Sequence, residues 1–149
     1  MPHKKILLAT DYSPAGEQAL KVATSLARDT GSRLIIAHVS ESELHPVGEL
    51  FNEEPKMSPR EIAQLEAIQP TASSVEYEHR LLFGEPGSME MVKPADEILK
   101  LASEEHVDMI VIGTHGRSGL GRMLMGSVAE HVIRGAACPV VTVKQPSDT

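Results

Sequence analysis

The stretch between Gly113 and Ser127, GTHGRSGLGRMLMGS, gathers groups that can bind an anion. It holds five of the chain's eleven glycines and two arginines, and it follows the apolar run DMIVI. Glycines let a ligand approach the backbone and adopt dihedral angles closed to other residues, the roles expected of Gly113 and Gly116. Gly126 and Ser127 would open a helix, whose first N–H groups attract negative charge. The stretch predicts a phosphate-binding site, and the alternative is a tight turn without a ligand.

Two common phosphate-binding motifs do not fit this stretch. The P-loop pattern GxxxxGK[ST] matches the glycine spacing of GRMLMGS, but Ser127 stands where the pattern needs lysine. The dinucleotide pattern GxGxxG fails because Leu124 stands in place of its last glycine, and because the stretch follows a late strand. Nicotinamide chemistry is therefore unsupported.

Charged and polar residues in the same stretch offer further ligand contacts. Arg117 and Arg122 can form charge-assisted hydrogen bonds with phosphate, Arg122 being the preferred one, although loop arginines also commonly face water. His115 is read as a solvated side chain. A hydrolytic triad of Ser127, His115 and Asp11 is disfavoured because the GxSxG motif is absent.

The composition limits the class of protein and partner. A chain of 149 residues fits one domain, with 145–149 as a flexible tail, and no apolar run approaches the roughly 18 residues of a membrane span. The formal charge of −7 and 3% aromatic residues disfavour nucleic acid. With Cys138 as the one cysteine and no secretion signal, we expect a reducing cytoplasm and a cysteine that acts as a small buried hydrophobic residue. The seven histidines show no metal-ligand spacing, so no protein metal site is expected.

The elements that must position these residues alternate along the chain. Nearly continuous apolar runs predict strands covered on both faces, and 75–83 is a weaker fifth strand. The four clear strands are 4–10, 33–39, 108–114 and 139–144. Helices are expected after Ser13 up to Gly31, around 58–69, at 94–106 and at 127–136. The order predicts a doubly wound, Rossmann-like α/β sandwich, with its ligand beyond the carboxyl ends of the strands.

The spacing Gly113-x-x-Gly116, nine residues, then Gly126-Ser127, resembles the nucleotide-binding signature of the universal stress protein family. The resemblance extends over ILLATDYSPAGEQAL, LIIAHV, ADEILKLASEEHVDMIVIGTHGRSG and SVAEHVIRGAACPVVTVK, which is nearly the full chain. It implies a five-stranded parallel sheet of order 3-2-1-4-5, with ATP lying across the switch point between the first and fourth strands.

The resemblance also implies a role for each matching residue. Asp11 would contact the ribose or adenine side, flanked by Ala9 and Thr10, and Val39 would meet adenine through its backbone. Gly113 and Gly116 would lie against the ribose and first phosphate. Gly126, Ser127 and Val128 would hold the phosphate tail.

Two further features concern the surface. In the family, the segment that corresponds to GEP leads directly into the one that corresponds to PADEIL, whereas here GSMEMVK separates them. We expect this insertion to form a lid or partner surface through Met89 and Met91, and the alternative is a tolerated surface loop. The last strand would be a sheet edge that needs cover. The resemblance implies that two copies pair there through Val140, Val141, Thr142 and Val143, and the alternative is a capped edge in a monomer.

The sequence therefore predicts a cytoplasmic, homodimeric, ATP-binding stress-response module, holding ATP or another adenine nucleotide with Mg²⁺. No catalytic residue is assigned, because no placed general base or P-loop lysine is found. One alternative is a slow ATPase or nucleotidyl-transfer enzyme that uses Asp11 or His115 with Mg²⁺. The other is a dimeric interaction protein without bound nucleotide.

Overall fold

The computed structural model describes residues 4–40, 59–83, 93–114 and 126–144. In this part of the chain, strands and helices alternate. The strands are β1 (Lys5–Ala9), β2 (Arg33–Val39), β3 (Tyr77–Leu82), β4 (Met109–Gly113) and β5 (Val140–Val143). The helices are α1 (Pro14–Thr30), α2 (Pro59–Glu66), α3 (Pro94–Glu104) and α4 (Ser127–Gly135). Each lies where the hydrophobic pattern predicted it, with ends that differ by a few residues.

All strand pairs are parallel, and the sheet has the order β3-β2-β1-β4-β5. This confirms the doubly wound topology predicted from the sequence. Because the chain winds from β1 toward β3 and then returns to add β4 and β5 on the other side, the winding reverses between β1 and β4. Ala9 pairs with Ile112 at the carboxyl end of this strand pair. An open α/β sheet binds ligands at this kind of switch point.

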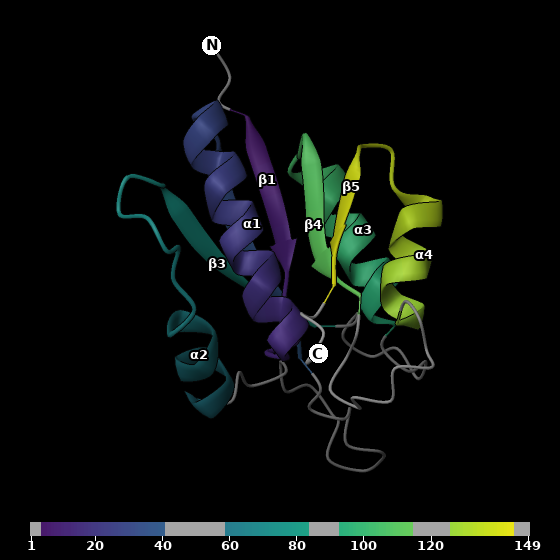
Figure 1. Ribbon diagram of the computed structural model, residues 1–149. Helices are drawn as coiled ribbons and strands as arrows, with labels where there is room; N and C mark the ends of the chain where they lie inside the picture. The colour runs from purple at the N-terminus through teal and green to yellow at the C-terminus, as the bar shows by residue number, and fades with distance from the viewer. Residues whose placement is uncertain (1–3, 41–58, 84–92, 115–125, 145–149) are drawn as a thin grey trace, which may run out of the picture.

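Helices cover both faces of the sheet and form two hydrophobic cores. Figure 1 shows α1 across one face, with α3 and α4 on the other. Leu65 of α2 joins the core on the α1 side. The core beneath α1 includes Ile6, Leu8, Ala19, Ala23, Leu34, Ile36 and Val111. The core beneath α3 and α4 includes Leu7, Ile35, Ile98, Leu101, Ile110, Ile112 and Val132. Burial on both faces explains why these strands are continuously apolar.

The start and end of α1 follow from its sequence. Ser13 has an extended backbone and its hydroxyl accepts a hydrogen bond from the N–H of Gly16, so it is the N-cap, and Pro14 begins the helix. Gly31 ends the helix in the left-handed region, with φ of 69°. The helix thus leads away from the carboxyl end of β1 within a few residues.

Candidate functional site

The carboxyl ends of β1 and β4 bring several predicted site residues together. The chain leaves β1 through Thr10, which is buried, and Asp11, which is partly buried. β4 ends at Gly113, beside the end of β1. Val39 ends β2, the strand on the other side of β1, and is also buried. Residues far apart in sequence therefore meet at one edge of the sheet.

A tight turn fixes the segment that carries Asp11. The Thr10 N–H extends the ladder to β2 by donating to the Ala37 carbonyl at 2.9 Å. The Thr10 hydroxyl accepts from the N–H of Tyr12 at 3.2 Å, and Asp11 Oδ1 accepts from the N–H of Ser13 at 3.0 Å. Short polar side chains commonly bind nearby backbone in this way and stabilise turns. The orientation of the Asp11 side chain is thus tied to the start of α1.

Gly113 has a structural reason to lack a side chain. A Cβ atom there would lie 2.9 Å from the backbone carbon of Ala15, in the first turn of α1. Gly113 is not among the residues with positive φ, so the expectation that it uses dihedral angles closed to other residues is wrong. It allows α1 to pack closely over the end of β4.

The first turn of α4 presents backbone donors beside β4. The N–H of Gly126 donates to the carbonyl of Thr114, the residue after β4, and this bond fixes where the helix begins. Gly126 is therefore tied to its own chain. The next N–H groups belong to Ser127, Val128 and Ala129, and an α-helix offers no internal partner for them. The described residues supply none either.

Gly126 itself leaves room at this helix start. Its φ of −50° is open to any residue, and a Cβ atom would meet only the Thr114 carbonyl oxygen at 3.5 Å among the described residues. Neither backbone strain nor packing in the described part of the chain requires glycine here. Open N–H groups at the start of a helix suit an anion.

Other predicted residues fall outside this geometry. Gly116, Arg117 and Arg122 lie outside the described residues, as do His115 and the methionines of the insertion. Cys138 was expected to be buried but is only partly buried, and it packs against the core beneath α3 and α4. Desolvation by burial raises the pKa of its thiol, which makes the reactive thiolate scarce at neutral pH. Among the residues that the structure describes, no three His, Cys, Asp or Glu side chains are placed to hold a metal ion.

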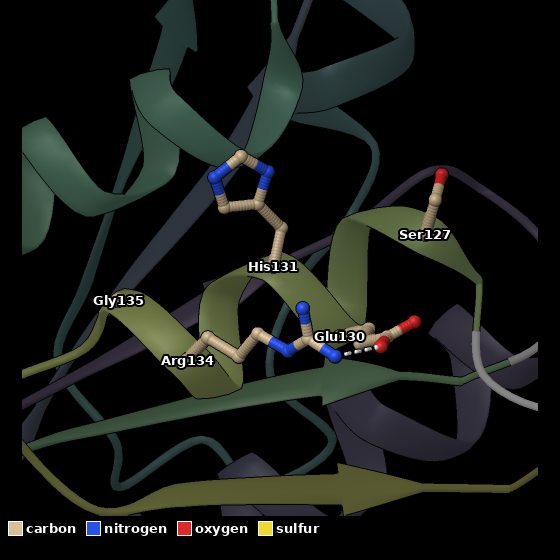
Figure 2. Close-up of a pocket in the computed structure, with 5 residues that line it drawn as sticks. All are labelled: Ser127, Glu130, His131, Arg134 and Gly135. Atoms are coloured by element: carbon tan, nitrogen blue, oxygen red, sulfur yellow. Dashed lines mark hydrogen bonds and ion pairs between the residues drawn. The ribbon is translucent and has the colours of Figure 1, made fainter.

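A surface hollow of about 400 Å³ follows one side of α4 away from the strand ends. Its lining consists of Ser127, Glu130, His131, Arg134 and Gly135. Figure 2 shows Arg134 paired with Glu130, at 2.7 Å, while the Ser127 hydroxyl points away from both. His131 lies 3.4 Å from Asp96 of α3. The charged side chains of this lining are thus engaged with protein partners and largely exposed, so the strand ends remain the better candidate.

Comparison with known proteins identifies the family. Residues 2–144 match the sequence profile of the universal stress protein family. The chain belongs to the universal stress protein family. A universal stress protein of Methanocaldococcus jannaschii is 33% identical over 97% of this chain and 84% of its own length. One from Thermus aquaticus is 34% identical, over 95% of this chain and 98% of its own.

Solved structures of universal stress proteins share the fold. A universal stress protein from Archaeoglobus fulgidus, solved in complex with dAMP, is 25% identical and superimposes with a TM-score of 0.62. The match covers 97% of this chain and 100% of that chain. A second solved protein, described as a test case of structural genomics, is 27% identical over all of both chains, with a TM-score of 0.69.

Sequence reasoning missed two residues beside Asp11 in this universal stress protein. Tyr12 has a φ of 64°, which is rare for a large side chain, and His38 is a buried histidine near the end of β2. Their rings lie 4.3 Å apart between centroids. His38 could have been noticed because it is a polar residue inside the apolar run LIIAHV. The unusual backbone conformation of Tyr12 could not be predicted from the sequence.

Proposed function

We propose that this universal stress protein binds an adenine nucleotide across the ends of β1 and β4, and that ATP is the first candidate. The observation that carries the proposal is the Gly126–Thr114 hydrogen bond. It sets the open N–H groups at the start of α4 beside the end of β4, and β4 pairs with the strand that leads to Asp11. A phosphate bound at the start of α4 and ribose hydroxyls bound by the Asp11 carboxylate would then lie at one switch point.

The residues present suit such a ligand. Ser127, Val128 and Ala129 offer backbone donors to a phosphate, and Asp11 offers an acceptor on the ribose or adenine side. Val39, Ala9 and Thr10 provide a buried wall that suits a base in a chain with few aromatic residues. Arg117 or Arg122 would add charge, and Mg²⁺ would arrive with the phosphates because the described residues form no metal site. The dAMP complex of the Archaeoglobus relative supports the nucleotide class.

The proposal is tested first on the protein as purified. Nucleotide released by denaturation is identified by mass spectrometry, and nucleotide-free protein is titrated with ATP and AMP, with and without Mg²⁺, in a calorimeter. Binding of an adenine nucleotide that is weakened by Asp11→Ala supports the proposal. The absence of both released nucleotide and binding heat refutes it and favours an interaction protein.

Binding without turnover separates the module from an enzyme. We expect no multiple-turnover ADP production, since no placed general base is found in the described residues and the P-loop lysine is missing. ADP production that Asp11→Ala abolishes would instead identify a slow ATPase.

The proposed module is a cytoplasmic homodimer joined along β5. β5 is the last strand of the sheet order, so one of its sides pairs with no strand of the described sheet. No helix in the described part of the chain is long and apolar enough to cross a membrane. Pairing of the β5 strands of two copies would cover the β5 edge of each copy at once.

A further inference from the structure

His38 is a polar side chain in a strand that is otherwise apolar. The four residues before it, Leu34 to Ala37, are at most 1% exposed, and His38 itself is 5% exposed. An imidazole buried without a hydrogen bond costs free energy, so the partner of His38 indicates what the residue does.

The partner is the backbone that leaves β1. His38 Nδ1 lies 2.7 Å from the carbonyl oxygen of Thr10. A carbonyl only accepts hydrogen bonds, so Nδ1 carries the proton and donates it. Since the Thr10 N–H is bonded to Ala37, β2 holds both backbone polar groups of Thr10, one by the strand ladder and one by the histidine.

The same imidazole ring also supports Tyr12. The two rings are tilted by 36° at a centroid distance of 4.3 Å. Tyr12 is in the left-handed region, with φ of 64°, which is unfavourable for a bulky residue unless its surroundings hold it there. His38 therefore contacts the residue before Asp11 and the residue after it.

We propose that His38 is a positioning residue of the nucleotide site. By fixing Thr10 and Tyr12, it sets the direction in which the Asp11 carboxylate leaves the backbone, toward the ribose or adenine side of the ligand. This inference rests on the proposed function and adds to it a residue that need not touch the nucleotide. A group that must meet a ligand hydroxyl gains affinity when neighbouring contacts fix its orientation in advance.

Two substitutions separate the hydrogen bond from the ring contact. His38→Asn keeps an N–H donor near the position of Nδ1 and loses the ring, whereas His38→Phe keeps a ring and loses the donor. In titrations with Mg-ATP, we expect His38→Phe to weaken binding about tenfold and His38→Asn to weaken it by less than about threefold. Circular dichroism and thermal unfolding confirm that each variant is folded before it is titrated.

A double-mutant cycle tests whether His38 acts through Asp11. In the Asp11→Ala background, His38→Phe should change affinity by less than about twofold, because no carboxylate remains to be directed. A purely structural role would instead weaken binding by the same factor in both backgrounds, and that result would overturn the inference. Wild-type affinity in His38→Phe would overturn it too.

The two proposals fail in different ways. If the wild-type protein binds no adenine nucleotide, the proposed function falls and the role of His38 falls with it. If the wild type binds and Asp11→Ala weakens binding, but His38→Phe does not, only the positioning role is refuted.

Discussion

Gly113 and Gly126 stand before and after the loop that carries the family signature, but they lack a side chain for different reasons. Gly113 lies against the backbone of Ala15, so α1 and β4 need its small size in order to pack. Gly126 meets no such obstacle among the described residues. The first glycine serves the fold, whereas packing among the described residues does not require the second.

The difference predicts opposite effects of two alanine substitutions on stability. Gly113→Ala should lower the free energy of unfolding by about 1–3 kcal/mol, because the methyl group would overlap the first turn of α1. Gly126→Ala is the matched control and should cost less than about 1 kcal/mol, since its backbone conformation accepts a side chain. Urea unfolding measures both. Equal stability of the two variants would contradict the structural role of Gly113.

A larger side chain at position 126 should instead impair binding. Gly126→Val places two methyl groups above the open N–H groups of the first turn of α4, where the phosphate is proposed to lie. We expect affinity for ATP to fall at least about tenfold while the folded structure is kept. Calorimetric titration of Gly126→Val and Gly126→Ala with ATP shows how the affinity depends on the size of the side chain at position 126. Unchanged ATP affinity in Gly126→Val would show that the phosphate lies elsewhere.

At the scale of elements, charged side chains join the end of α3 to β1, β2 and β3. Glu105, just after α3, lies 3.2 Å from Lys5 of β1 and 2.6 Å from Arg80 of β3. Glu78 bridges Arg80 and Arg33 at 3.3 and 3.5 Å. The Glu105 side chain is only 21% exposed, so solvent screens its carboxylate less than an ordinary surface carboxylate. The network joins four elements, α3, β1, β2 and β3, away from the proposed nucleotide site.

This network predicts a pH dependence of stability. The hydrogen bond from Lys5, helped by the charge of Arg80, outweighs desolvation and lowers the pKa of Glu105 below its ordinary value of 4.5. A carboxyl whose pKa is lower in the folded state stabilises the fold above its unfolded-state pKa, and this contribution is lost as the pH falls toward the lowered value.

Glu105→Gln should therefore cost about 1 kcal/mol at about pH 7, and the loss should shrink toward zero as the pH falls below about 4. Urea unfolding across this range measures it. Glu104→Gln, one residue earlier on an exposed position, is the control and should change little. A pH-independent difference between Glu105→Gln and wild type would exclude the carboxylate as its source.

The elements show where sequence reasoning succeeds and where it stops. β1, β2 and β4 are buried on both faces and must be continuously apolar, so these strands and their parallel pairing were predictable. β5 has the same apolar pattern, but the expectation that both its faces are covered is wrong, because it is only partly buried. The cap at Ser13 fixed the start of α1. The packing role of Gly113 could not be predicted from the sequence, because Ala15 approaches this glycine only after α1 folds over β4. The contact of His38 with Thr10 also depends on two strand ends meeting. Local patterns therefore place the elements, while the details of the site arise from packing between them.

At the scale of the whole molecule, the side of β5 that pairs with no strand of the described sheet determines how two copies could join. The carbonyls of Pro139 and Val143 accept from Ile110 and Thr114, so the backbone groups of odd-numbered residues face β4. Backbone direction alternates along a strand, and the N–H and C=O groups of Val140 and Thr142 therefore face away from the sheet. Two such edges are complementary across a twofold axis.

Thr142→Pro tests this assembly because proline removes one outward N–H and leaves the bonds to β4 in place. If two β5 strands pair, the variant should dissociate at protein concentrations at least about tenfold higher than the wild type. Thr142→Ala keeps the N–H and should remain dimeric. Sedimentation equilibrium measures the dissociation constants, and thermal unfolding checks that the protomer is intact. A dimer of undiminished stability in Thr142→Pro would place the interface on another surface, whereas a monomeric wild type would show that the edge of β5 is not used for self-association.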